Sequence, residues 1–167
     1  MTPAKFSSLQ EVQQAIRSGQ LSHLELVNHY LARIEATQHL NAYIEVYASE
    51  ARDKARRLDQ RMMEDPDQLG ALAGMVVSLK DVICHKDHQV TAASKILEGF
   101  TSLYSATAVK KILAKDAIII GRTNCDQFAM GLSETMNKPW LKKGLIRTKY
   151  GESQTRKGRV ERYDSVL

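Results

Sequence analysis

Residues 117–121 read Ala-Ile-Ile-Ile-Gly, and this short run constrains the fold more than any other part of the chain. A strand places successive side chains on opposite faces, so a run that is apolar throughout needs cover on both faces. Such runs are typical of central strands in sheets that carry helices on either side. The run therefore predicts an α/β protein in which residues 117–121 lie inside the sheet.

A second strand and a helix precede this run. Residues 75–83, Met-Val-Val-Ser-Leu-Lys-Asp-Val-Ile, have the length and β-branched content of a strand. Residues 107–115 place Val109, Ile112 and Leu113 on one helical face. Strand, helix and strand joined by short links form a β-α-β unit, which again predicts α/β architecture.

The N-terminal part of the chain predicts three helices and one extended segment. A helix is expected over residues 8–18, and Ser22 with Glu25 forms a capping box that begins a second helix. Residues 42–47 alternate in polarity and predict a short strand or an extended link. A charged helix over residues 49–63 is expected to turn its apolar positions inward, namely Ala51, Ala55 and Leu58.

Composition indicates a soluble globular protein. The chain has 167 residues, of which 43% are hydrophobic and 26% charged, enough for one core of ordinary size. Its start does not resemble a signal peptide, and no apolar stretch approaches the length of a membrane span. We therefore expect a cytoplasmic protein whose two cysteines, Cys84 and Cys125, are free thiols.

The positive charge of the chain is concentrated at its C-terminus. Residues 137–167 contain nine Lys or Arg and three acidic residues, whereas the rest of the chain is nearly neutral. We expect a domain over residues 1–136 and a basic tail over residues 137–167 that is disordered or weakly helical. A basic tail can bind the phosphates of a nucleic acid, but such runs are more often simply solvated.

Lys80 stands out because it is an ammonium within the apolar strand 75–83. Strand periodicity places it on one face with Val76 and Ser78. Removing an ammonium from water is costly, which favours the neutral amine and with it a role as a proton acceptor. Two structural alternatives stay open: the side chain can extend to solvent from the strand end, or pair with the adjacent Asp81.

Polar residues also follow the buried run. Residues 123–127 read Thr-Asn-Cys-Asp-Gln, and the carboxyl end of an α/β strand is where ligand sites tend to form. The same residues can equally serve as turn formers or as a helix cap. The five histidines lack the spacing of metal ligands, so residues 85–88, His-Lys-Asp-His, predict a polar loop and no metal site is expected.

Four segments in order carry a resemblance to a known family. They read Ser-Leu-Lys-Asp-Val-Ile-Cys at 78–84, Thr-Ala-Ala-Ser-Lys-Ile-Leu-Glu at 91–98, Ala-Thr-Ala-Val at 106–109 and Gly-Arg-Thr-Asn-Cys-Asp-Gln-Phe-Ala-Met-Gly at 121–131. Together they resemble the amidase signature family over residues 8–135. Within that family, residues 93–97 and 126–131 are similar to the A subunits of tRNA-dependent Asp/Glu amidotransferases. The resemblance implies the N-terminal part of the amidase signature fold, a mixed sheet covered by helices.

This resemblance implies a Ser–Ser–Lys triad with Lys80 as its general base. A bridging serine relays a proton from a second serine, which attacks the side-chain amide of glutamine and releases ammonia. The resemblance also places Met130, Gly131 and Ser133 on the substrate side of the pocket, with Ser133 not the nucleophile.

The resemblance further implies that the released ammonia is used in a second reaction, the amidation of an aminoacyl-tRNA. The complete amidotransferase converts Glu-tRNA(Gln) to Gln-tRNA, or Asp-tRNA(Asn) to Asn-tRNA. The implied partners are its B and C subunits and, through the complex, aminoacyl-tRNA. No cofactor is expected in this chain, and ATP and magnesium are expected in the partner subunit.

The sequence departs from the family pattern after residue 136. The family's Gly/Ser-rich stretch, which holds both catalytic serines, has no counterpart in residues 136–167, so neither serine is identified. The change in charge and periodicity suggests a frame change or truncation, which reading the coding DNA in three frames would test. The alternatives are an inactive fragment that only docks to a partner, another amidase-type amidohydrolase, or a basic nucleic-acid binder.

Overall fold

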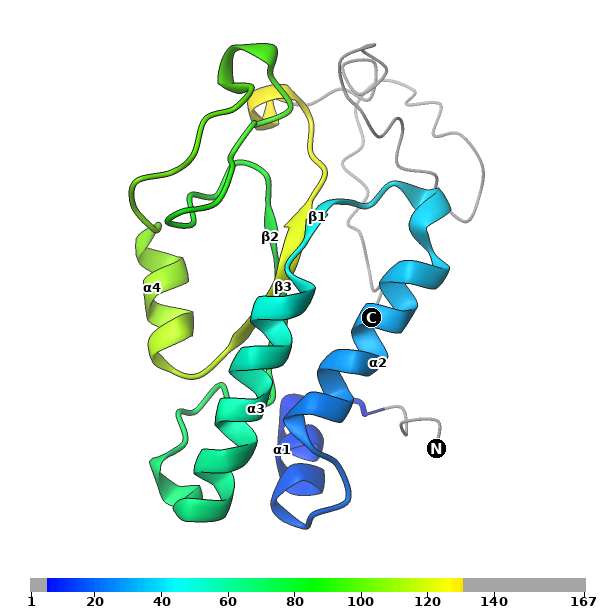
Figure 1. Ribbon diagram of the computed structural model, residues 1–167, viewed down its shortest axis with the longest axis vertical. Coiled ribbons are helices and arrows are strands. Elements are labelled where there is room, and N and C mark those ends of the chain that lie inside the picture. The colour runs from blue at the N-terminus through cyan, green and yellow to red at the C-terminus, as the bar shows by residue number, and fades with distance from the viewer. Residues whose placement is uncertain (1–5, 131–167) are drawn as a thin grey trace.

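The computed structural model describes residues 6–130, which form a three-stranded sheet with helices on both faces (Figure 1). Its elements are α1 Leu9–Arg17, α2 His23–Ala36, η1 Gln38–Leu40, β1 Tyr43–Val46, α3 Ala48–Glu64, η2 Pro66–Gln68, β2 Val76–Lys80, η3 Lys95–Leu97, α4 Thr107–Ala114, β3 Ile118–Thr123 and η4 Gln127–Ala129. The helices and strands expected from the sequence are present. The strand expected over 75–83 is shorter, because it ends at Lys80 in a turn closed by the Ile83 amide.

The buried apolar run forms the centre of the sheet, as its sequence predicts. The strand order is β1-β3-β2, with β2 parallel and β1 antiparallel to β3. The sheet is therefore mixed, and the β2-α4-β3 unit supplies its parallel pair. The expected α/β class is confirmed by this topology.

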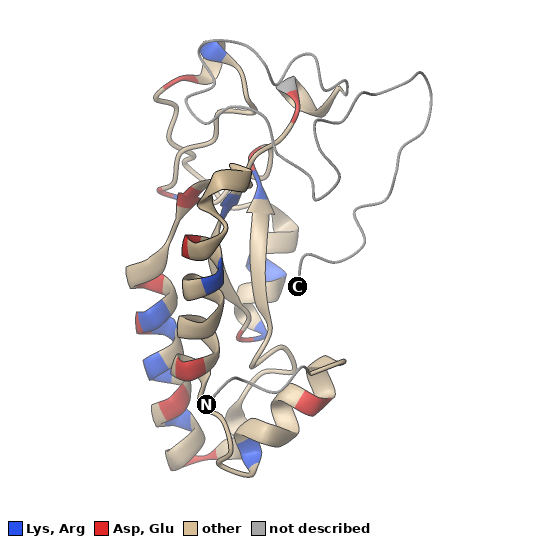
Figure 2. Ribbon diagram, turned by 90° about the vertical axis from the view of Figure 1, so that its right-hand side faces the viewer, with Lys and Arg blue, Asp and Glu red and all other residues tan. Residues whose placement is uncertain are grey.

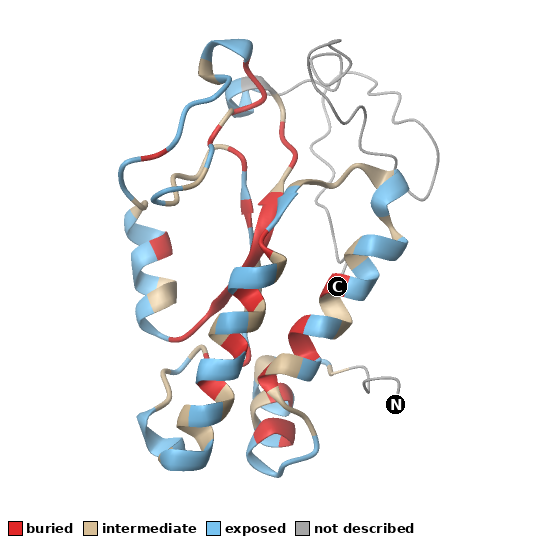
Figure 3. Ribbon diagram, in the orientation of Figure 1, coloured by how far each residue is buried: buried red, intermediate tan, exposed pale blue. Residues whose placement is uncertain are grey.

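The central strand β3 is buried along nearly all of its length (Figure 3), because an apolar layer covers each of its faces. On one face, Ile118 and Ile120 pack against α2 and α3, where Ala51, Ala55 and Leu58 are at most 1% exposed. On the other face, Ile119 packs with Leu79 and with Val109 of α4. The members of the first layer are Val27, Leu31, Ala51, Ala55, Leu58, Ile118 and Ile120.

The capping box predicted at Ser22 and Glu25 is in place, and α1 also begins with a side-chain cap. Ser8 caps α1, and Ser22 and Glu25 form the reciprocal capping box of α2. The Asp59 carboxylate of α3 adds a cap by accepting from the backbone amides of His23 and Leu24. Charged residues of both signs lie along the outer helical surfaces (Figure 2), and no helix within residues 6–130 is long and apolar enough to span a membrane.

Gly121 is required where β1 approaches β3. A Cβ atom at this position would lie 2.5 Å from the Glu45 carbonyl oxygen, much closer than any normal contact. The register of β1 against β3 is irregular between Tyr43 and Glu45, next to this close approach. The glycine that ends the apolar run therefore allows the two strands to pair.

Asp116 holds the turn between α4 and β3 against α3. Its carboxylate accepts from Lys54 Nζ and Arg61 Nη1, both at 2.9 Å, and from the Gly70 amide at 2.8 Å. Burial of the carboxyl acts to raise the pKa of Asp116, but these three donors outweigh it and hold the pKa well below its ordinary value. A carboxyl whose pKa is lowered by folding stabilises the folded chain above its unfolded pKa of about 4.

We predict that Asp116→Asn lowers the free energy of unfolding by about 2 kcal/mol at pH 7, because charge-assisted hydrogen bonds are lost. Asparagine also tolerates the left-handed backbone at this position, where φ is +69°. The difference from the wild type should shrink as the pH falls below about 4, because the carboxyl then becomes protonated in the unfolded chain while it is still ionised in the folded chain.

Urea unfolding at several pH values measures this effect, with Asp53→Asn as the matched control. Among residues 6–130, Asp53 pairs with Arg56 alone, and both side chains are more than half exposed, so its loss should change stability by less than about 0.5 kcal/mol. Equal losses in both variants, or an Asp116→Asn deficit that does not change with pH, would contradict the assignment.

Candidate functional site

The candidate site lies where β2 and β3 end side by side. Lys80 is the last residue of β2 and is in register with Thr123, the last residue of β3. Asn124 and Cys125 follow directly and are buried. The structure thus brings Lys80 together with the polar segment that follows the buried run, as expected for the carboxyl edge of a parallel pair.

The Lys80 side chain is exposed in the part of the chain that the structure describes. The expectation that its apolar strand buries the ammonium is wrong for these residues, and the side chain instead extends to solvent from the strand end. Residues 6–130 cover the neighbouring Leu79, which is 4% exposed, but not the Lys80 side chain. A role for Lys80 as a base stays a prediction.

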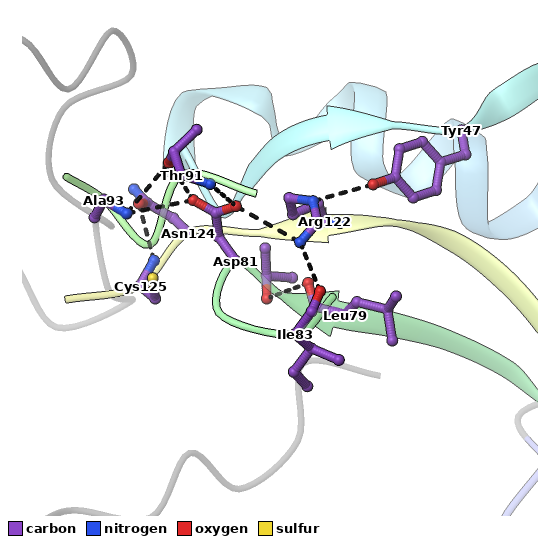
Figure 4. A network of polar contacts seen from close by, with 10 residues as sticks. Tyr47, Leu79, Asp81, Ile83, Thr91, Ala93, Arg122, Asn124 and Cys125 are labelled. Atoms are coloured by element: carbon purple, nitrogen blue, oxygen red, sulfur yellow. Dashed lines mark hydrogen bonds and ion pairs between the residues drawn. The ribbon is translucent and has the colours of Figure 1, made fainter. Parts of the chain in front are cut away.

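Asp81, the residue after Lys80, is completely buried and binds a loop (Figure 4). Its carboxylate accepts from the Thr91 amide at 3.1 Å, from the Thr91 hydroxyl and from the Ala93 amide at 3.4 Å. Its backbone carbonyl accepts from the Ala92 amide at 2.8 Å. Asp81 therefore connects the end of β2 to residues 91–93, and it does not pair with Lys80, which was one of the alternatives left open by the sequence.

Ala92 and Ala93 adopt left-handed backbone conformations, with φ of +48° and +52°. Each such conformation costs an L-residue about 1–2 kcal/mol and persists only where surrounding contacts hold it. Here their two amides point at the carbonyl and the carboxylate of Asp81. Contacts to Asp81 thus help to hold both alanines in the left-handed conformation.

Arg122 supplies the positive charge opposite Asp81. Its guanidinium is 1% exposed, and Nη1 lies 3.6 Å from Asp81 Oδ1 and donates to the Ile83 carbonyl at 3.0 Å. Its Nε donates to the Tyr47 hydroxyl at 3.1 Å. Burial raises the pKa of the Tyr47 phenol, with Arg122 opposing that rise, so the phenol is protonated at neutral pH and its oxygen accepts this bond.

Cys125 is close to the site but is a poor nucleophile. Burial raises the pKa of its thiol to about 11, with Asp81 adding to the rise and Lys80 opposing it. The thiolate is the reactive form of cysteine, so almost none is present at neutral pH. Cys84 and Cys125 are both free thiols, as expected from the sequence.

The substrate-side residues predicted from the sequence are described only in part. Met130 follows η4 and its side chain is 83% exposed, whereas Gly131 and Ser133 lie outside the described residues, as does the tail 137–167. The contribution of these residues to a pocket stays a prediction.

The polar loop at residues 85–88 packs beside Tyr47. The rings of His85 and His88 are stacked with centroids 4.1 Å apart, and His88 Nε2 lies 3.1 Å from a Glu50 carboxylate oxygen. Burial, and next the neighbouring His88, lowers the pKa of His85. Among residues 6–130, no group of three His, Cys, Asp or Glu side chains is arranged to hold a metal ion.

The sequence reasoning missed the Asp81–Arg122 pair. One signal was available: Arg122 lies in a strand that is otherwise buried on both faces, and a buried charge requires a partner. The partner itself, far away in sequence, becomes evident only when β2 and β3 pair.

Comparison with known proteins gives consistent matches. The Amidase family model matches residues 25–140. The A subunit of glutamyl-tRNA(Gln) amidotransferase from Chlorobium phaeobacteroides (strain BS1) is 42% identical over 128 residues, which are 77% of this chain and 27% of that protein. The chain therefore spans about a quarter of the length of the curated relatives that it matches.

Solved structures share the fold. An amidase family protein from Bacillus anthracis str. Ames matches with a TM-score of 0.74 and 29% identity, over 88% of this chain and 30% of that one. Native peptide amidase from Stenotrophomonas maltophilia matches with a TM-score of 0.75 and 25% identity, over 88% of this chain and 31% of that one. The arrangement of helices around a mixed sheet is thus the arrangement found in amidases.

We predict that Cys125 reacts with iodoacetamide at pH 8 at least about 100-fold more slowly in the native chain than in the unfolded chain, because burial raises its pKa and blocks access. Cys84, which is partly exposed, is the internal control and should be alkylated first. Peptide mass spectrometry quantifies both sites. Equal alkylation rates in the native chain would contradict the burial of Cys125.

Proposed function

We propose that this chain, which belongs to the Amidase family, carries the base-bearing part of a glutamine-hydrolysing site, as in the A subunits of tRNA-dependent amidotransferases. The observation that carries the proposal is the position of Lys80 at the carboxyl edge of β2, beside the end of β3 and next to a buried charge pair. The identity of 37–42% to glutamyl-tRNA(Gln) amidotransferase A subunits supports this choice within the family.

In the proposed reaction, Lys80 accepts a proton so that a serine hydroxyl can attack the glutamine amide. An amine accepts a proton only when neutral, and a low-dielectric surrounding favours that form. Because residues 6–130 leave Lys80 exposed, polypeptide outside this range has to cover the amine and supply the nucleophilic and bridging serines. The proton then passes to the leaving nitrogen, so that ammonia departs and an acyl-enzyme remains, which water hydrolyses.

The partners follow from the same proposal. The ammonia would pass to the B and C subunits of the amidotransferase for amidation of Glu-tRNA(Gln) or Asp-tRNA(Asn) in the cytoplasm. ATP and magnesium would bind outside this chain, in the partner subunit. Solved amidases with differently named substrates share this fold, so the fold alone does not select glutamine over other amides.

A reconstitution assay tests the proposal. The full chain is mixed with amidotransferase B and C subunits and with the remainder of the A subunit from Chlorobium phaeobacteroides, made as a separate polypeptide. We predict ammonia release from glutamine by the mixture and none by the chain alone. Lys80→Met should reduce the rate by a factor of about 10²–10⁴, the range for loss of a general base.

Lys110→Met is the matched control, since Lys110 is an exposed lysine on α4 away from the strand ends, and it should leave the rate unchanged. Ammonia release that is equal with and without Lys80 would contradict the proposal. Binding to the other subunits without any turnover would favour a docking fragment instead, and faster hydrolysis of another amide would favour a different amidase.

A further inference from the structure

We propose that Arg122 is a positioning residue for Lys80, acting through the residues on its C-terminal side. The inference rests on the proposed function, in which Lys80 is the general base. In this role, the buried guanidinium of Arg122 holds the end of β2, from which the Lys80 amine projects.

Arg122 contacts the turn that directly follows Lys80. Its Nη1 donates to the Ile83 carbonyl at 3.0 Å and lies 3.6 Å from the Asp81 carboxylate. One guanidinium therefore contacts two residues of the turn from the side of β3, as Figure 4 shows. Because Arg122 belongs to the central strand, its backbone is the most firmly supported part of the sheet.

The backbone of Lys80 is fixed by the same turn. Its carbonyl accepts from the Ile83 amide at 2.9 Å, and the next amide, that of Asp81, donates to the Thr123 carbonyl at 3.0 Å. Loss of the Arg122 contacts to Ile83 and Asp81 would therefore loosen the hydrogen bonds on which the direction of the Lys80 side chain depends.

The loop over residues 91–93 supports the turn from the opposite side. Thr91 and Ala93 donate to the Asp81 carboxylate, so the carboxylate lies between the loop and the guanidinium (Figure 4). A catalytic group must be held within a fraction of an ångström of its productive position, and buried supporting contacts achieve this.

The Nη2 atom of Arg122 indicates that the stability of the fold alone does not explain why an arginine is buried at this position. Nη2 is buried without a hydrogen-bond partner among residues 6–130, and burying an unpaired donor is unfavourable. Apolar residues of similar volume often replace buried ion pairs without loss of stability. A buried guanidinium with one unpaired nitrogen is better explained by the directed contacts that its other nitrogens make.

Native-state amide hydrogen exchange, followed by NMR on the full chain, tests the inference. In Arg122→Met, we predict that the amides of Asp81 and Ile83 exchange at least tenfold faster than in the wild type. The amide of Leu31, in the core of α2, should change by less than twofold once global stability is matched with denaturant. Arg122→Lys should restore most of the protection, because an ammonium still pairs with Asp81.

Two further variants complete the test. Thr91→Val removes one donor to Asp81 and should raise exchange at the same amides by a smaller factor, which provides a result if Arg122→Met does not fold. Tyr47→Phe removes only the Nε contact and should leave the Asp81 and Ile83 amides unchanged. Unchanged exchange at Asp81 and Ile83 in the Arg122→Met and Thr91→Val variants would overturn the inference.

The reconstitution assay separates this inference from the proposed function. If both hold, Arg122→Met lowers kcat for glutamine at least tenfold with KM within twofold, and Arg122→Lys recovers most of kcat. If exchange changes as predicted while turnover does not depend on Lys80, the proposed function fails and the structural role of Arg122 remains. An unchanged kcat in Arg122→Met, with turnover dependent on Lys80, would overturn the positioning role.

Discussion

The buried pair of Asp81 and Arg122 is the interaction on which the end of the sheet depends. Both side chains are at most 1% exposed, and taking two charges out of water is favourable only when each is closely partnered. Asp81 meets this condition with donors from a loop, and Arg122 with Tyr47 and the Ile83 carbonyl. Through these contacts two strand ends and the loop over residues 91–93 become a single unit.

This unit explains how the chain presents Lys80 although it leaves the side chain in solvent. The backbone at the end of β2 is fixed from the side of β3 and from the loop, and the amine projects from the fixed end. The chain belongs to the Amidase family, as the resemblance at residues 78–84 and 121–131 predicted. The chain spans about a quarter of the length of its curated relatives, and under the proposed function polypeptide outside residues 6–130 completes the site.

The local sequence was sufficient to predict the helices and strands, whereas the details of the candidate site depend on contacts between residues far apart in the sequence. The apolar run at 117–121 predicted the central strand because a run without polar residues requires cover on both faces, and Ser22 with Glu25 predicted a helix start because the capping bonds are local. The exposure of Lys80 was one of the alternatives that the sequence left open, since periodicity assigns a residue to a face but does not say what covers it. The left-handed conformations of Ala92 and Ala93 could not be predicted either, because alanine carries no turn signature and the contacts that hold them come from the backbone carbonyl and the carboxylate of Asp81.

The most direct measurement is a double-mutant cycle between Asp81 and Arg122, in which the free energy of unfolding is determined for Asp81→Asn, Arg122→Met and the double variant. We predict that each single change costs about 3–5 kcal/mol, because it leaves a buried partner unpaired. The double variant should lose at least about 2 kcal/mol less than the sum of the two single losses. Additive losses would show that the two charges do not depend on each other, and would contradict the central role given to this pair.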